Sequence, residues 1–152
     1  MGEDHPWLLD KYFDRVIEYL EWSIHHSRCN QTQSLAHLAL GVLLFEKAVQ
    51  SPVCDQKKML LLARYYLEET FNITFSKTSR EIIMIYQALV EVCLDNLPDA
   101  LKFLTRAGKI SESPLPIWKI LSSVYKALGQ NRVVLFYTTK IKSYKENHST
   151  IL

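Results

Sequence analysis

The fold is decided by the stretch Trp118-Lys-Ile-Leu-Ser-Ser-Val-Tyr-Lys-Ala-Leu-Gly129. Its large side chains Trp118, Leu121 and Tyr125 recur at intervals of three and four residues, which places them on one face of a helix. Gly129 follows the last apolar residue of this pattern, at the position where helices commonly end. The stretch therefore predicts an amphipathic helix that closes at a turn.

The same helical spacing continues through the rest of the chain. Leu8, Tyr12, Val16 and Leu20 recur every four residues and predict a first helix with one apolar stripe. No segment has the alternation of a convincing strand ladder. The predicted fold class is therefore all-α, with about seven antiparallel helices. The expected helices cover residues 7–28, 34–50, 55–71, 78–94, 99–108, 118–128 and 132–147.

Several turn signals separate these helices. Thr78 and Glu81 have the spacing of a capping box, in which a hydroxyl and a carboxylate satisfy each other's exposed backbone donors. Gly108 is expected to end the fifth helix as a left-handed C-cap. Residues 113–116, Ser-Pro-Leu-Pro, predict an extended break before the Trp118 helix.

The Trp118 helix resembles the first helix of a tetratricopeptide (TPR) repeat, which consists of two antiparallel helices in about 34 residues. The family's pattern continues in the second helix with a small residue, a large apolar residue and another small residue. Ala100, Leu104 and Ala107 fit that pattern. The resemblance implies an α-solenoid scaffold that presents a helical surface to another macromolecule.

The last helix departs from the pattern. One repeat length after Ala100, Leu104 and Ala107, the corresponding positions hold Val134, Thr138 and Ile141. Because Val134 and Ile141 stand where the family has small residues, the resemblance implies looser packing at that end.

We expect residues 1–152 to form one domain. Its length, with 48% hydrophobic and 22% charged residues, is sufficient for a sizeable core. Residues 1–30 are expected to supply an N-terminal helix. The helix pairs are expected over residues 33–75, 78–110 and 114–147. An irregular helical bundle is the alternative architecture.

The resemblance also implies where a partner would bind. In TPR proteins the first helix of each pair lines a groove, and the positions one and five residues after the Trp position face into it. These positions are Lys119 and Ser123 here, and Lys126 lies a turn further. Two lysines on one helix face can hold a carboxylate, a phosphate or an acidic peptide, although a solvated helix face gives the same pattern.

Charge is unevenly distributed along the chain. Residues 1–76 carry a net charge of −3 and residues 77–152 carry +5, which gives the total of +2. An acidic ridge is expected on the first helix. Its residues are Asp10, Asp14, Glu18 and Glu21. Such polarity can orient a partner protein, attract a nucleic acid or align protomers head to tail, or it can reflect two solvated faces.

The last helix is expected to carry an apolar and basic surface that another molecule covers. Its candidate residues are Val133, Phe136, Tyr137, Lys140, Ile141 and Tyr144. We expect the partner to be another protein or peptide, and the domain to serve as a scaffold or adaptor subunit. A homo-oligomer is an alternative, and nucleic acid a less favoured one because the pI of about 8.4 lies below the strongly basic range.

Enzymatic motifs are missing from the sequence. Glu21, His25 and Cys29 span about 12 Å along one helix, too far for all three to bind one metal ion. We therefore expect no catalytic residue, metal or cofactor. Cys29, Cys54 and Cys93 are expected to be buried free thiols. The acidic N-terminus lacks signal-peptide character, which favours an intracellular protein with no membrane partner; nucleus and cytoplasm are not distinguished.

Overall fold

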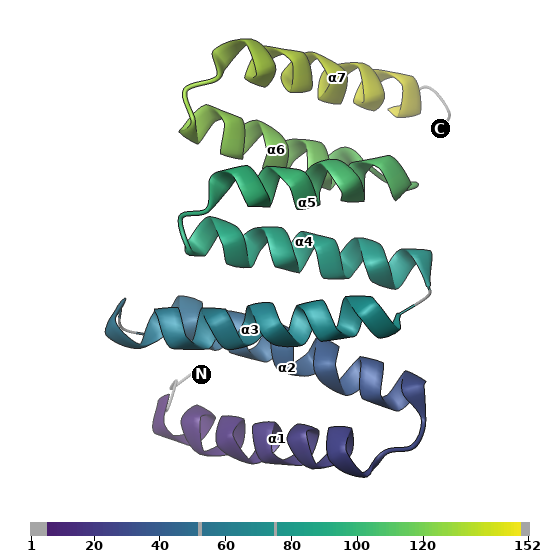
Figure 1. Ribbon diagram of the computed structural model, residues 1–152. Helices are drawn as coiled ribbons and strands as arrows, with labels where there is room; N and C mark the ends of the chain where they lie inside the picture. The colour runs from purple at the N-terminus through teal and green to yellow at the C-terminus, as the bar shows by residue number, and fades with distance from the viewer. Residues whose placement is uncertain (1–5, 52, 75, 150–152) are drawn as a thin grey trace. The chain divides into compact units, whose positions relative to one another are not determined.

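The chain folds entirely into α-helices over its described residues. The computed structural model describes residues 6–51, 53–74 and 76–149, and the side chains of residues 13–51, 55–74 and 76–148. Seven helices and no strand lie in these ranges, which confirms the predicted all-α class (Figure 1). The helices are α1 (Pro6–His26), α2 (Asn30–Gln50), α3 (Val53–Ile73), α4 (Lys77–Cys93), α5 (Leu97–Ile110), α6 (Leu115–Ala127) and α7 (Asn131–Ser149).

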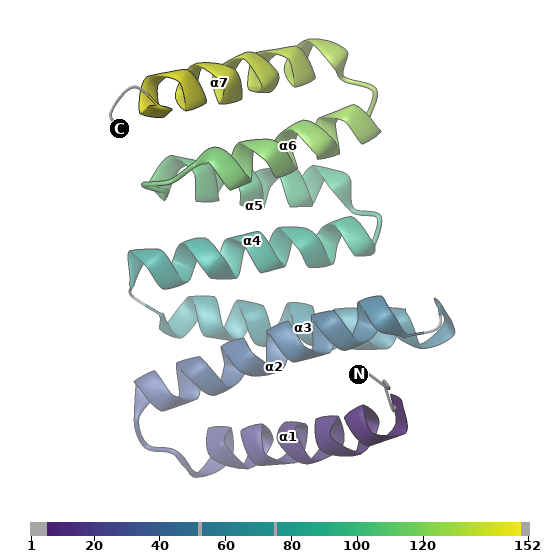
Figure 2. The ribbon, with the colours of Figure 1, turned by 180° about the vertical axis from the view of Figure 1, so that it is seen from behind.

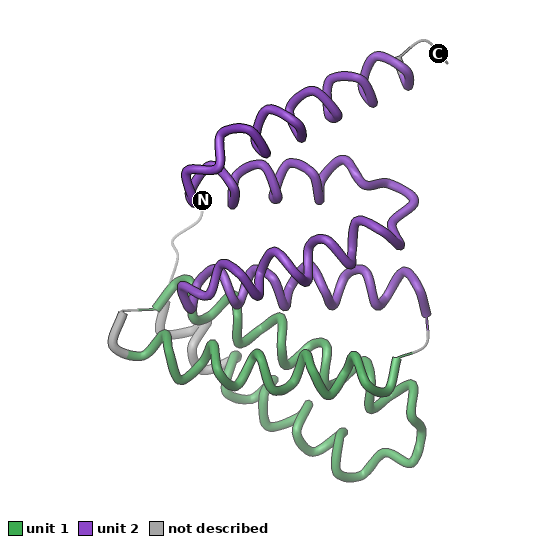
Figure 3. Tube along the Cα trace, turned by 45° about the horizontal axis from the view of Figure 1, so that its top comes forward, with its two compact units in different colours: residues 1–74 green, residues 75–152 purple. Residues whose placement is uncertain are grey.

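The helices belong to two compact units, residues 1–74 and residues 75–152 (Figure 3). In the first unit α2 packs against both α1 and α3. In the second unit α4 packs on α5, α5 on α6 and α6 on α7, each helix beside the next one in the sequence (Figure 2). Consecutive packed helices of this kind agree with a helical repeat. The expectation of a single domain stays a prediction.

The core of the first unit is built where α2 and α3 approach closely. Leu40 on α2 and Leu67 on α3 are fully buried. Gly41 lies beside Leu67, so close that a Cβ atom at residue 41 would stand 2.7 Å from Leu67 Cγ. A glycine at this position therefore lets the two helices approach, and the nearly all-apolar sequence of α2 supplies both of its packed faces.

The core of the second unit is formed by one buried stripe from each of α4, α5 and α6. Ile83 on α4, Leu104 on α5 and Leu121 on α6 are at most 2% exposed. Ala100, Leu104 and Ala107 are all fully buried. Thr138, which corresponds to Leu104 one repeat later, is exposed and its hydroxyl donates to the Val134 carbonyl within α7. The last helix therefore buries less of its surface than α5 does.

Three predicted turns differ from the structure. Helix α4 begins at Lys77 and its N-cap is Ser76, so the predicted capping box of Thr78 and Glu81 is wrong. Glu81 instead accepts a hydrogen bond from the Ser111 hydroxyl at 2.7 Å. Gly108, the predicted left-handed C-cap, lies inside α5 without a positive φ, whereas Gly129 has a left-handed φ of 73°. The break before α6 is shorter than expected, because the backbone of its N-cap, Pro114, already has helical dihedral angles and the helix starts at Leu115.

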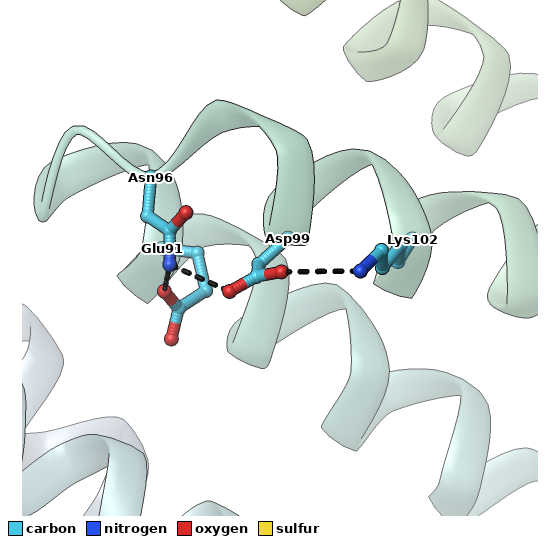
Figure 4. Close-up of polar contacts among 4 residues, drawn as sticks. All are labelled: Glu91, Asn96, Asp99 and Lys102. Carbon is cyan, nitrogen blue, oxygen red and sulfur yellow. Dashed lines mark hydrogen bonds and ion pairs between the residues drawn. The ribbon is translucent and has the colours of Figure 1, made fainter.

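A polar cluster closes the turn between α4 and α5 (Figure 4). The Asn96 side-chain amide donates to Glu91 Oε2 at 2.9 Å and to Asp99 Oδ2 at 2.7 Å. The other Asp99 oxygen lies 3.6 Å from Lys102 Nζ. Glu91 is only 4% exposed, so the amide of Asn96 helps to keep a buried carboxylate hydrogen-bonded.

Replacing Asn96 with alanine is expected to lower the free energy of unfolding by about 1 kcal/mol, because it removes two hydrogen bonds to charged groups at a partly buried turn. Urea unfolding followed by circular dichroism measures the change. Lys102→Ala is the matched control, since it removes only the exposed ion pair and should change stability by less than about 0.5 kcal/mol. Equal effects of the two substitutions would show that the amide bridge does not stabilise the turn.

Candidate functional site

The larger candidate site is an open groove between α6 and α7, which we call the Trp118 groove. It encloses about 740 Å³. Trp118 on α6 forms one wall, and successive turns of α7 form the other. Its lining residues are Trp118, Arg132, Leu135, Phe136, Thr139, Lys140, Ser143, Tyr144 and Asn147.

Aromatic rings and one cation are held together inside this groove. The ring of Trp118 meets the ring of Tyr144 edge to face, with centroids 5.6 Å apart. Lys140 Nζ lies 4.5 Å from the centroid of Trp118 and 5.5 Å from that of Phe136. Such contacts attract the ammonium group to the ring faces and position it over an apolar wall.

The charged residues that line the Trp118 groove are all positive. Arg132 and Lys140 are basic, and none of the nine lining residues is acidic. Both basic side chains are exposed, as are Leu135 at 67% and Phe136 at 57%. The groove can therefore bind a ligand that combines a negative charge with an apolar or aromatic group.

A second, smaller groove of about 340 Å³ lies where α4, the start of α5 and α6 meet, and we call it the Lys119 groove. Its walls are almost entirely apolar, and Lys119 and Ser123 are its two polar lining residues. The Ser123 hydroxyl donates to the Lys119 carbonyl at 3.1 Å. The other lining residues are Leu89, Val92, Leu97, Ile120, Val124 and Ala127.

The structure separates the three predicted groove residues. Lys119 and Ser123 line the Lys119 groove, whereas Lys126 is exposed on α6 and does not line it. The predicted pair of lysines on one binding face is therefore reduced to one lysine beside an apolar pocket. This pocket suits an aliphatic or aromatic side chain better than a phosphate.

The predicted C-terminal surface is also divided. Phe136 and Lys140 are exposed and line the Trp118 groove. Tyr144 is half-buried and lines it as well, while Val133, Tyr137 and Ile141 are half-buried without lining it. Tyr137 stacks on Tyr125 of α6 with ring centroids 5.9 Å apart. Burial, with a smaller contribution from Tyr125, raises the pKa of the Tyr137 hydroxyl.

The acidic ridge is present on α1 over the described side chains. Asp14, Glu18 and Glu21 are all exposed, and Asp10 lies outside the described side chains. Exposed apolar and aromatic residues lie on the same helix at Val16, Tyr19 and Trp22. The indole of Trp22 stacks on the His26 ring with centroids 4.4 Å apart.

Comparisons with protein-family models, with curated proteins and with solved structures give no match. The function proposed below therefore rests on the geometry and charge of the two grooves and of α1.

Other chemistry-bearing residues are distributed singly. Cys29 and Cys93 are free and exposed, so the prediction of burial is wrong for both, and the side chain of Cys54 is outside the described set. Partial burial raises the pKa of Cys93, whereas the amides of Thr32 and Gln31 at the start of α2 lower the pKa of Cys29. Across the described residues, no three His, Cys, Asp or Glu side chains gather as metal ligands would. Each described helix is too short or too polar to cross a lipid bilayer.

Sequence reasoning missed six of the nine groove residues, namely Trp118 on α6 and five residues on α7. Leu135, Thr139, Ser143 and Asn147 recur along α7 every four residues, with Arg132 one turn before Leu135 and Phe136. This spacing is visible in the sequence as one helix face. The prediction selected mainly apolar residues of α7, and three of these, Val133, Tyr137 and Ile141, are half-buried without lining the groove.

Proposed function

We propose that this protein is a non-enzymatic protein–protein interaction module, a scaffold or adaptor subunit of a larger assembly. Its Trp118 groove would hold an acidic segment that carries at least one aromatic or large apolar side chain. The single observation that carries the proposal is the exposed aromatic and basic lining of this groove, in which Phe136 is 57% exposed beside Lys140.

The proposal is supported by the free energy that is gained when the apolar part of this lining is removed from water. Exposed Leu135 and Phe136 form an apolar patch that a partner can bury with a gain of about 25 cal/mol per Å². Aromatic and arginine side chains are enriched in interfaces, where a buried anchor commonly contributes about 2 kcal/mol or more. Lys140 and Arg132 at the same wall would select a negatively charged segment.

As part of this proposal we place the chain among the TPR-like helical repeats. The second helices of the last two pairs, α5 and α7, begin at Leu97 and Asn131, a separation that equals one TPR repeat. The Lys119 groove, between the first helices of these pairs, would accept an apolar side chain of a partner. The spacing supports the resemblance, and the groove supports a binding role.

The experiment is photo-crosslinking from within the groove. A photo-reactive amino acid replaces Thr139, an exposed lining residue, and the tagged protein is captured from nuclease-treated cell extract. Mass spectrometry identifies the crosslinked peptide. We expect an acidic peptide with an aromatic or large apolar residue from one stoichiometric protein.

Two matched charge reversals test whether the groove itself binds. Lys140→Glu should weaken capture about thirtyfold, the effect of losing an interface anchor of about 2 kcal/mol. Lys142→Glu changes the net charge equally, but Lys142 does not line the groove, so capture should remain within about twofold. A parallel capture without nuclease completes the test: if every associate found there is lost after nuclease treatment, the proposal is overturned and a nucleic-acid binder is favoured.

A further inference from the structure

We infer that the segment held by the Trp118 groove is helix α1 of a second copy of this chain. The inference rests on the proposed function and names its partner. Helix α1 presents the required chemistry, because acidic and aromatic side chains are exposed on it side by side.

The exposed face of α1 is arranged in two adjoining stripes. Ile17, Leu20 and Ile24 are half-buried on the side of the helix that packs toward α2. At 100° per residue, Asp14, Glu18 and Glu21 form a stripe on one flank of this side. Tyr19, which is 66% exposed, and Trp22 follow on the outer face. A docked α1 can therefore present carboxylates and aromatic rings to the same partner surface.

The Trp118 groove offers the complementary set along a sufficient length. Its lining on α7 extends from Arg132 to Asn147, about 22 Å of helix axis. The stripe from Asp14 to Trp22 needs about 12 Å. An amphipathic helix lying in a groove is a common mode of recognition, with anchors three and four residues apart. With α1 antiparallel to α7, Glu18 can pair with Lys140 while Trp22 packs on Phe136, because both pairs of residues are four positions apart on their helices. Asp14 and Glu21 add negative charge beside the same basic wall.

The net charges of the two units agree with this pairing. The unit of residues 1–74 carries 7 basic and 10 acidic residues, and the unit of residues 75–152 carries 11 basic and 6 acidic ones. Their net charges are thus −3 and +5. Opposite charges favour encounter of the first unit of one copy with the second unit of another, whereas like units repel.

The resulting contact is heterologous, because α1 of one copy meets α7 of the next copy. Each pair of copies still offers one α1 and one groove to further copies, so association continues beyond a dimer unless the ends meet in a ring. The expected observable is a mass that rises with protein concentration and falls with salt. Raising the salt from about 0.05 M to about 0.5 M shortens the Debye length to a few Å and should weaken association at least tenfold.

A charge-swap experiment on the full chain tests the inference. The α1 variant carries Asp14→Lys and Glu18→Lys, and the groove variant carries Arg132→Glu and Lys140→Glu. Sedimentation velocity is measured for each variant alone and for their mixture. Each variant alone should be monomeric at concentrations where the wild type associates. The mixture should associate again, because each variant then meets a partner of the opposite charge.

Two control variants keep the same net charges while leaving both faces intact. Lys142→Glu with Lys145→Glu matches the groove variant, and Glu46→Lys with Glu68→Lys matches the α1 variant. All four residues are exposed and lie outside the groove lining and α1. Both controls should associate as the wild type does, and circular dichroism establishes that every variant is folded.

Three results would overturn the inference. These are a wild type that is monomeric at all concentrations, a mixture that stays monomeric, and controls that lose association as completely as the groove variant. The proposed function can hold even where this inference fails. If the wild type is monomeric but residue 139 still crosslinks to an acidic segment of a different protein, the proposed function is kept and the second copy is excluded as the partner.

Discussion

Replacing Gly41 with valine is expected to lower the free energy of unfolding by about 3 kcal/mol, the upper part of the range for overpacked cores. The added Cβ atom would stand 2.7 Å from Leu67 Cγ and 2.8 Å from its Cδ2. Leu67 is fully buried and its backbone nitrogen lies only 3.4 Å from the same point, so the side chain cannot simply rotate away. Helices α2 and α3 would have to separate.

Denaturant unfolding measures the change, and two variants isolate its cause. Gly108→Val is the matched control, because a Cβ there meets only Ile117 Cγ2 at 3.7 Å. We expect a change below about 1 kcal/mol for it. Combining Gly41→Val with Leu67→Ala should cost clearly less than the sum of the two single substitutions. Additive costs would contradict the close approach of the two helices at this point.

Replacing Tyr137 with alanine is expected to lower the free energy of unfolding by about 2 kcal/mol, less than for a fully buried aromatic residue because its ring is only half-buried. The ring stacks on Tyr125 and meets Phe136 edge to face at 5.2 Å. Since α7 packs against α6 through contacts of this kind, the substitution should loosen α7 more than the rest of the second unit.

Hydrogen exchange of the α7 amides, read by mass spectrometry beside chemical unfolding, measures this loosening. Phe136→Ala is the control at the adjacent position, and we expect it to change stability by less than about 0.5 kcal/mol because that ring is exposed. Equal losses of stability for Phe136→Ala and Tyr137→Ala would contradict the placement of Phe136 in the exposed groove and of Tyr137 against α6.

Tyr137→Phe separates the ring from its hydroxyl. Burial raises the pKa of Tyr137 in the folded protein, so its contribution to stability is complete below the unfolded pKa of about 10 and is lost as pH rises through the folded pKa. The phenylalanine variant should therefore match the wild type near neutral pH and lose less stability above a pH of about 10.

The sequence was sufficient to predict the helices, since their apolar spacing is a local property. The seven helices lie within a few residues of the predicted ranges, and Gly129 follows the end of α6 as predicted. The capping box failed because α4 begins earlier than expected: the Ser76 hydroxyl accepts from the Ser79 amide, so Thr78 already lies in the first turn of the helix. Gly108 misled the prediction because a glycine can also continue a helix, and α5 runs on to Ile110.

The candidate site was less predictable, because it depends on which side of α7 faces α6. Apolar character pointed equally to Phe136 and Tyr137, although only Phe136 lines the Trp118 groove. Which side of α7 faces α6 is set by the contacts of α7 with Trp118 and Tyr125, two residues that lie on α6. The acidic ridge on α1 could be predicted without knowing which helix packs against which. Its residues are three or four positions apart in one helix, and this spacing alone places them on the same side.

The order of packing within each unit has a consequence for how the chain reaches its native state. Helices that pack closely in either unit are consecutive in the sequence. Each helix–helix contact therefore requires the closure of only a short loop. Proteins rich in such local contacts fold in microseconds to milliseconds. During synthesis at about 5–20 residues per second, α2 and α3 can pair while α4 to α7 are still being made. The ribosome would thus release a chain whose first unit is already folded.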